Sequence, residues 1–402
     1  MADNLELIPV PGIRLGTAAA GIQKPGRQDL LLVEIAPGSN CAAVYTRNAF
    51  CAAPVLLARE HQSQAVPHYL LVNSGCANAG TGAQGLADAQ ACCQAVAEIT
   101  QCQAIQVLPF STGVIGERLP VGKIVKSLPC AHQNLSAADW SAAAQTIMTT
   151  DTRAKGVSRQ FVSNGVTITV TGIAKGSGMI RPDMATMLAY IATDMSVAPA
   201  VLQTCLQRAV AVSFNCITVD GDTSTNDACI LMATGQSSHA QVESLDGEAG
   251  LSLQQALNEV CIELAQAIIR DGEGATKFIT IDVRGGATEQ ECRQVGYTVA
   301  QSPLVKTAFF ASDPNWGRIL AAVGRAEVDG LDIGQVQIFL DEVCIVAAGE
   351  RAPDYTEAAG ARVMQRDQIT VLIELGRGTS QAQVWSCDLS YDYVRINAEY
   401  RT

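Results

Sequence analysis

Residues 175–194 read KGSGMIRPDMATMLAYIATD, a glycine-rich segment that runs directly into an apolar stretch beginning at Thr186. The apolar positions Met184, Met187, Leu188 and Ile191 fit one face of a helix, but the stretch is also short enough for a buried strand. Periodicity alone leaves both alternatives open. Thr186 is the residue of chemical interest, because a cut before it would free an α-amine that can serve as the base for its own hydroxyl.

Helical and extended patterns alternate along the rest of the chain. Three- and four-residue periodicity predicts helices over residues 84–99, 137–148, 199–212 and, most clearly, 252–269. Apolar and β-branched runs predict strands over residues 69–72, 105–108, 165–171, 278–283, 336–340 and 369–375. This mixture predicts an α/β or α+β protein, and a change in composition near Gly285–Glu289 is the best candidate for a domain boundary.

The composition excludes several classes of partner. The chain has 402 residues, of which 48% are hydrophobic and 16% charged, and its formal net charge is -12. A negative protein is not attracted to phosphate backbones or anionic membranes, so we expect neither nucleic acid nor a membrane surface as a partner. The N-terminal segment lacks a basic region followed by an apolar one, and no apolar run approaches the roughly 18 residues needed to span a bilayer. We therefore expect a cytoplasmic protein.

Cysteine and histidine usage does not indicate disulfides or a metal. The 14 cysteines are too sparse for a disulfide scaffold, and most lie within apolar patterns, which is typical of reduced core residues. No CxxC motif occurs, and the four histidines are far apart in the sequence. We expect no metal site.

Three polar or glycine-rich motifs have simple structural explanations. GTGAQG at residues 80–85 matches a dinucleotide fingerprint, but the next predicted strand ends without the acidic residue that would bind the ribose. VDGDTSTND at 219–227 lacks the glycine and glutamate of a calcium loop, so a turn rich in Asp and Asn is the better interpretation. DGEGATK at 271–277 follows the clearest helix and fits a helix stop.

The motif PFSTGV at residues 109–114 has two interpretations. It follows a predicted strand, so it is either a simple turn that ends the strand or a turn whose backbone N–H groups converge with the Thr112 hydroxyl. Converging donors near Thr112 and Gly113 would suit an oxyanion hole, which must hold its donors where negative charge develops.

Eight motifs taken in order resemble one known family. They read NSGCANAGTG, PFSTGVIGERLP, MTTDT, KGSGMIRPDMATMLAYIATD, VDGDTSTND, DGEGATKF, SDPNWGRI and RINAEYRT. Together they resemble the ornithine acetyltransferase family, also called the bifunctional ArgJ family, over nearly the whole chain. An ordered set of this kind is far more specific than a single glycine pattern.

The resemblance implies a precursor that cuts itself between Ala185 and Thr186, giving an α chain of residues 1–185 and a β chain of residues 186–402. Thr186 would then accept the acetyl group of N2-acetyl-L-ornithine and pass it to L-glutamate in a ping-pong reaction. Thr112 and Gly113 would form the oxyanion hole. No cofactor is implied, and the use of acetyl-CoA as a second acetyl donor stays open.

The resemblance also implies substrate contacts, a fold and an assembly. The implied substrate-binding residues are Thr152, Lys175, Thr186, Glu273, Asn397 and Thr402. The implied fold is an αββα sandwich of the DmpA/ArgJ type, with a smaller α/β domain from about residue 286, in an α2β2 heterotetramer. In that fold the run after Thr186 is a buried strand. Arg181 and Asp183 depart from the usual family residues, which puts the rate of self-cleavage in question rather than its position.

Three other functions compete with this one. Related αββα proteins with N-terminal nucleophiles are amidases or aminopeptidases, in which water receives the acyl group. A related acetyltransferase could use a different acceptor. A metabolite-binding protein would never cleave and would be indifferent to Thr186→Ala.

Overall fold

The structure is a computed structural model that describes residues 5–181 and 187–399. The chain forms two compact units. The larger unit contains the chain up to Gly176 together with Arg181–Asn215 and Thr223–Ile268. The smaller unit contains Ser177–Ile180, Cys216–Asp222 and the chain from Ile269 onward. None of the helices within the described ranges is long and apolar enough to cross a membrane.

The larger unit is built on two sheets. The first has the strand order β1-β2-β4-β5 and consists of β1 (Ile13–Ala18), β2 (Leu30–Ile35), β4 (Tyr69–Cys76) and β5 (Val107–Val114). The second has the order β3-β10-β8-β7-β6 and consists of β3 (Asn40–Tyr45), β10 (Ala228–Ala233), β8 (Leu188–Thr193), β7 (Val166–Lys175) and β6 (Lys155–Ser163). Side chains of both sheets form one shared core, in which Phe110 of β5 meets Tyr190 of β8 edge to face at 5.5 Å between ring centroids.

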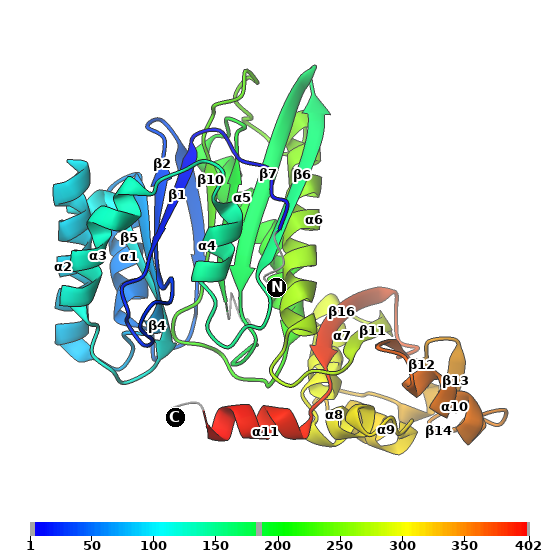
Figure 1. Cartoon of the computed structure of the whole chain (residues 1–402). Coiled ribbons are helices and arrows are strands. Elements are labelled where there is room, and N and C mark those ends of the chain that lie inside the picture. Colours follow the sequence, from blue (N-terminus) through cyan, green and yellow to red (C-terminus); the bar gives the residue numbers. More distant parts are fainter. Residues whose placement is uncertain (1–4, 182–186, 400–402) are drawn as a thin grey trace. The chain divides into compact units, whose positions relative to one another are not determined.

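Helices cover the outer faces of both sheets (Figure 1). The first sheet is covered by α1 (Ala53–Gln64), α2 (Gly82–Thr100) and α3 (Val121–Gln133), and the second by α5 (Pro199–Ala211) and α6 (Glu248–Arg270). A short helix, α4 (Trp140–Thr146), contributes Trp140 to the core between the sheets. The layers therefore run α, β, β, α, which confirms the predicted sandwich.

The stretch after Thr186 is a strand wherever the structure describes it. β8 has all six residues buried and pairs antiparallel with β7 and parallel with β10. A central strand with both faces covered reads as a continuous apolar run, which explains why its periodicity was uninformative. The choice of a buried strand is confirmed for residues 188–193.

The turn predicted at residues 109–114 is wrong, because β5 continues through this motif to Val114. β4 likewise extends beyond the predicted residues 69–72 to Cys76, and the two strands pair in parallel with Ser74 opposite Thr112 and Gly75 opposite Gly113. Serine and glycine residues concealed these strand ends, since both are poor strand formers in isolation.

The smaller unit contains a mixed sheet of seven strands in the order β14-β13-β12-β15-β11-β16-β9. Its strands are β9 (Ile217–Thr218), β11 (Phe278–Gly286), β12 (Gln337–Leu340), β13 (Val343–Ala347), β14 (Glu350–Arg351), β15 (Gln368–Glu374) and β16 (Ser380–Cys387). Its helices are α7 (Glu289–Ala300), α8 (Pro303–Phe310), α9 (Trp316–Gly324), α10 (Glu357–Met364) and α11 (Tyr391–Ala398). The change in composition near Gly285–Glu289 falls between β11 and α7, within this unit. Short 3-10 helices cover Ala104–Gln106, Phe214–Cys216 and Ile333–Gln335.

Candidate active site

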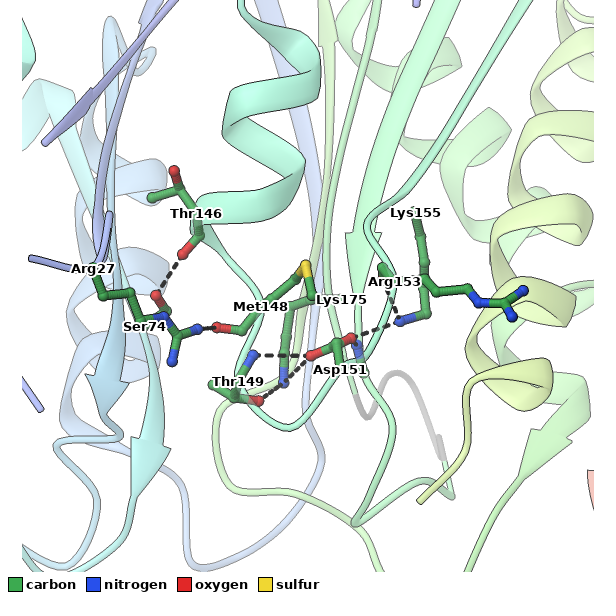
Figure 2. A network of polar contacts seen from close by, with 10 residues as sticks. Arg27, Ser74, Thr146, Met148, Thr149, Asp151, Arg153, Lys155 and Lys175 are labelled. Carbon is green, nitrogen blue, oxygen red and sulfur yellow. Dashed lines mark hydrogen bonds and ion pairs between the residues drawn. The ribbon is translucent and has the colours of Figure 1, made fainter. Parts of the chain in front are cut away.

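The end of β5 carries Thr112 and Gly113, the two residues predicted to form an oxyanion hole, and β4 pairs with it. Gly113 has a φ of 134°, and a Cβ atom there would lie 2.4 Å from the carbonyl carbon of Gly75. Only glycine fits this position, because a side chain would collide with the neighbouring strand. Thr112 is partly buried beside it, opposite Ser74. The Ser74 hydroxyl donates to the carbonyl of Thr146, which ties the end of β4 to α4 (Figure 2).

A network of buried charges surrounds Asp151 (Figure 2). Its carboxylate accepts hydrogen bonds from the backbone N–H of Thr149 at 3.0 Å and of Gly176 at 2.7 Å. The ammonium of Lys155 lies 2.7 Å from one carboxylate oxygen, and that of Lys175 lies 3.7 Å from the other. Lys175 also donates to the Thr149 hydroxyl at 2.6 Å. Asp151 therefore fixes the position of Lys175 at the end of β7.

Asp151 keeps its negative charge despite being buried. Burial by itself raises the pKa of a carboxyl group, but Lys175 and Lys155, with the hydrogen bonds from Lys155 and the Thr149 N–H, act against burial and hold the pKa of Asp151 well below its usual range. The Lys175 side chain is 10% exposed, whereas that of Lys155 is 2% exposed. Of the two cations, Lys175 is thus the one that a solute can approach.

A second buried carboxyl, Asp227, lies at the start of β10. Burial raises its pKa well above the ordinary value, and the Ser224 hydroxyl and Lys175 oppose that rise only in part. Its Oδ2 atom is buried and has no hydrogen-bond partner in the described part of the chain. Burial therefore favours the protonated form of Asp227.

Strand pairing brings Lys175 and Asp227 to the two sides of β8. Lys175 is paired with Leu188 across the antiparallel β7–β8 ladder. On the other side, the N–H of Ala228 donates to the carbonyl of Met187 at 3.0 Å. Met187 directly follows Thr186 in the chain, so Lys175 and Asp227 flank the first residues that the structure describes after Thr186.

Two predicted substrate contacts lie together in the smaller unit. The Glu273 carboxylate accepts a hydrogen bond from the Asn397 side chain at 2.7 Å, and its backbone N–H donates to Ser177 at 2.8 Å. A Cβ atom on Gly178 would lie 2.4 Å from the Glu273 carboxyl carbon, so glycine is needed for this close approach. The carboxylate is buried and Asn397, on α11, is exposed.

Asp220 orders the adjacent GSGMI segment. Its carboxylate accepts from the backbone N–H of Met179 at 2.7 Å and of Ile180 at 2.9 Å. It also accepts from the N–H of Asp222 at 3.2 Å, which confirms the Asx-type turn predicted for this motif. The hydroxyl of Tyr393 lies 3.3 Å from the same carboxylate. Sequence analysis identified this turn but not its second role in holding residues 179–180.

The structure describes some of the predicted site residues, and these belong to both units. Ala185, Thr186 and Thr402 lie outside the described residues. Thr112, Gly113, Thr152 and Lys175 belong to the larger unit, and Glu273 and Asn397 to the smaller one. Thr152 is exposed and directly follows Asp151 in the chain. Asp151 and Asp227 were not predicted as site residues, although each is an acidic residue inside a quoted motif.

The larger unit has the buried Lys175 at the end of β7 and the buried Asp227 directly before β10. Its layers place the protein in the general class of αββα sandwich proteins. Residues 14–402 match the ArgJ family, and the chain belongs to this family of arginine-biosynthesis enzymes. It is 62% identical to the arginine biosynthesis bifunctional protein ArgJ of Methylococcus capsulatus, over 100% of this chain and 98% of that protein. It is 59% identical to the protein of the same name from Pseudomonas fluorescens, over 98% of each.

Among solved structures, the chain is similar to an arginine biosynthesis bifunctional protein ArgJ from Bacillus halodurans. The two share 36% sequence identity, with a TM-score of 0.49, and the match covers 52% of this chain and 96% of the other.

Proposed function

We propose that this enzyme moves an acetyl group from N2-acetyl-L-ornithine to L-glutamate through an acetyl ester on Thr186. The observation that carries the proposal is the pair of groups flanking the start of β8. Lys175 is paired with Leu188, and Ala228, next to the buried Asp227, is bonded to Met187. A cation and an acid beside the strand that continues from Thr186 suit a nucleophile acting on an amino-acid derivative.

The first step of the proposal is maturation. The Thr186 hydroxyl attacks the carbonyl carbon of Ala185, and the peptide C–N bond breaks in an N-to-O acyl shift that leaves an ester and a free α-amine. Water hydrolyses the ester and restores the hydroxyl. The products are an α chain of residues 1–185 and a β chain of residues 186–402, which begins with the nucleophile.

The second step is acetyl transfer. The Thr186 oxygen attacks the acetyl carbonyl while its proton moves to the Thr186 α-amine, and the resulting oxyanion is stabilised by Thr112 and Gly113. Collapse of this intermediate expels ornithine, whose leaving nitrogen takes the proton. The amine of glutamate then attacks the ester by the same route in reverse. Support comes from the close approach of Gly75 to Gly113, which leaves no room for a Cβ atom at this point of β5.

Substrate recognition follows from charge. Lys175 offers a partly exposed ammonium to a substrate carboxylate, and Thr152 is exposed nearby in the chain segment that follows Asp151. The buried carboxylate of Glu273, bonded to Asn397, offers a negative partner for a substrate ammonium. Thr402 completes the proposed set of contacts.

The proposal includes an assembly and a location. The two chains of one precursor stay together as an α2β2 heterotetramer in the cytoplasm, and the reaction needs no cofactor because an ester on a hydroxyl carries the acetyl group. Acetyl-CoA serves as a second donor for the acetylation of glutamate. This last activity is consistent with the name bifunctional protein that both relatives carry.

The test begins with the masses of the purified wild type and Thr186→Ala under denaturing conditions. We expect two wild-type fragments, one beginning at Thr186, and an intact variant. Thr204→Ala is the matched control, because Thr204 is an exposed threonine on α5 that bonds only within its own helix. A single uncut wild-type chain would defeat the proposed maturation.

Product analysis then separates the acceptors. Incubation with N-acetylornithine and glutamate is expected to give N-acetylglutamate in an amount equal to the ornithine released. Free acetate in place of N-acetylglutamate would indicate a hydrolase, and no transfer to glutamate with transfer to other amines would indicate a different acceptor. The same assay with acetyl-CoA and glutamate tests the second donor.

A further inference from the structure

Asn226 is a buried polar residue to which the proposed reaction gives no role. It lies two residues before β10, and its exposed fraction is 6%. Its side-chain nitrogen donates to the carbonyl oxygens of Ala77 at 2.6 Å and Ser111 at 2.9 Å, while its side-chain oxygen accepts from the Thr225 hydroxyl. Two carbonyl oxygens require a donor, so the orientation of the amide is defined by its surroundings. Every polar atom of the side chain is engaged.

The two carbonyls lie on either side of the proposed oxyanion hole. The Ser111 carbonyl belongs to the same planar peptide unit as the N–H of Thr112. The hydrogen bond from Asn226 to this carbonyl therefore also fixes the orientation of the Thr112 N–H. Ala77 directly follows β4, and its N–H donates to the carbonyl of Val114 at 3.0 Å. Asn226 therefore holds the chain directly before Thr112 and, through Ala77, directly after Gly113.

The segment that carries Asn226 is itself firmly held. The carbonyl of Thr223 accepts from the Asn48 side chain at 2.9 Å, and that of Ser224 accepts from the Thr46 hydroxyl at 2.8 Å. The carbonyl of Thr225 accepts from the N–H of Ala52 at 2.9 Å. These bonds hold three successive peptide units directly before Asn226. The backbone that carries the Asn226 side chain is therefore fixed in position.

This segment also connects to the strand of the nucleophile. Immediately after Asp227, the N–H of Ala228 bonds to the carbonyl of Met187, and β10 then runs parallel to β8. One short stretch of chain thus bonds to β5 in the first sheet and to β8 in the second. The Asn226 side chain is therefore one of the links between the two sheets.

We propose that Asn226 is a positioning residue for acetyl transfer, setting the spacing between Thr112–Gly113 and the strand that continues from Thr186. This inference rests on the function proposed above. Oxyanion donors act only when they are held in place before the charge develops, within about 0.5 Å of the productive geometry. Removing the Asn226 donors would leave two buried carbonyls without partners and would free the end of β5 to shift.

The experiment compares Asn226→Asp and Asn226→Ala with wild type in the full chain. The Asp variant keeps the size of the side chain but replaces the donor with an oxygen facing two carbonyl oxygens. Rates are expressed per mole of cleaved protein, determined by mass. We expect kcat to fall by about 10–100-fold with KM within threefold, because the lost interaction acts on the transition state. Thr112→Ala, which removes a donor itself, is expected to lose about 10²–10³ in kcat.

Asn40→Asp is the matched control. Asn40 begins β3, and its side-chain nitrogen donates to the carbonyl of Val197 at 2.8 Å, so it makes the same kind of bond away from β5. We expect its kcat to be that of wild type. A purely structural role for Asn226 would lower the thermal midpoint of both Asn variants and leave kcat per folded, cleaved enzyme unchanged, and that result would overturn the inference.

Two further outcomes distinguish a failure of the inference from a failure of the proposed function. If neither Asn226 variant yields folded protein while Asn40→Asp does, Asn226 is a folding residue and the inference fails. If wild type forms no N-acetylglutamate, the proposed function fails instead. An active wild type, together with Asn226 variants that have a lower kcat and a KM within threefold of wild type, supports both the proposed function and the inference.

Discussion

Two segments of the larger unit each bury an aspartate, and they affect its charge in opposite ways. Asp151 meets two lysines and two backbone N–H groups, which hold its pKa well below the usual range despite burial. Asp227 is buried with one oxygen unpartnered, and burial raises its pKa well above the usual range. Burial alone therefore does not decide the charge of a carboxyl group. The cations and hydrogen-bond donors around the carboxyl group decide it.

The contrast accounts for the charge available to a substrate. The positive charge of Lys175 favours the ionised form of both carboxyls. It helps to lower the pKa of Asp151, and it offsets only part of the rise that burial causes in the pKa of Asp227. If Asp227 holds a proton, only Asp151 balances the two lysines, and the group as a whole retains a positive charge. That surplus lies on Lys175, the more exposed cation, where a substrate carboxylate would complete the balance.

The largest expected effect comes from breaking the Asp151 network. Asp151→Asn leaves the buried ammonium groups of Lys155 and Lys175 without their shared counter-ion, so we expect the free energy of unfolding to fall by about 3–5 kcal/mol. Urea denaturation at pH 7 measures this. Adding Lys155→Met to the same chain should recover part of the loss, since it removes the less exposed of the two cations. An Asp151→Asn variant as stable as wild type would show that the network is not a paired unit.

The pH dependence of stability sharpens the same comparison. A carboxyl whose folded pKa lies below its unfolded value of about 3.9 contributes stability above that pH and loses it as the pH falls towards the folded pKa. For Asp151 we therefore expect wild type to lose stability below about pH 4. The slope of unfolding free energy against pH should be smaller in Asp151→Asn. Equal slopes in the two proteins would assign the acid sensitivity to other carboxyls, such as Glu34.

Asp227→Asn is expected to have a smaller effect and the opposite pH dependence. A protonated carboxyl is nearly replaced in shape and charge by an amide. Below about pH 3.9, where the unfolded carboxyl is also protonated, we therefore expect a change of at most about 1 kcal/mol in unfolding free energy. Because the folded pKa is raised, the contribution of the wild-type carboxyl is fully present below about pH 3.9 and is lost as the pH rises through the folded pKa. The unfolding free energy of the variant relative to wild type should therefore increase as the pH rises. A destabilisation as large as that of Asp151→Asn would mean that Asp227 is charged.

The sequence predicted the sandwich and much of the site because long apolar runs and ordered motifs carry that information locally. It failed where tertiary pairing decides. The end of β5 was predicted as a turn, since Ser111 to Gly113 look unlike a strand until β4 is placed beside them. Asp227 was interpreted as part of a turn, and its buried environment arises only from the pairing of β10 with β8. The bonds of Asn226 join positions 149 and 115 residues away, which local sequence patterns do not report.

The smallest expected effect is at an ion-pair cluster in the smaller unit. Arg366 lies 2.6 Å from Asp341 and 2.7 Å from Glu342, and it lowers the pKa of Glu342 to about 2. Both distances are about as short as the 2.7 Å between Lys155 and Asp151, yet the Arg366 side chain is 46% exposed, so water and salt already screen each charge. We expect Arg366→Gln to leave the urea midpoint unchanged at moderate salt. A clear loss that disappears at high salt would show that distance, and not burial, is the better guide to the strength of these pairs.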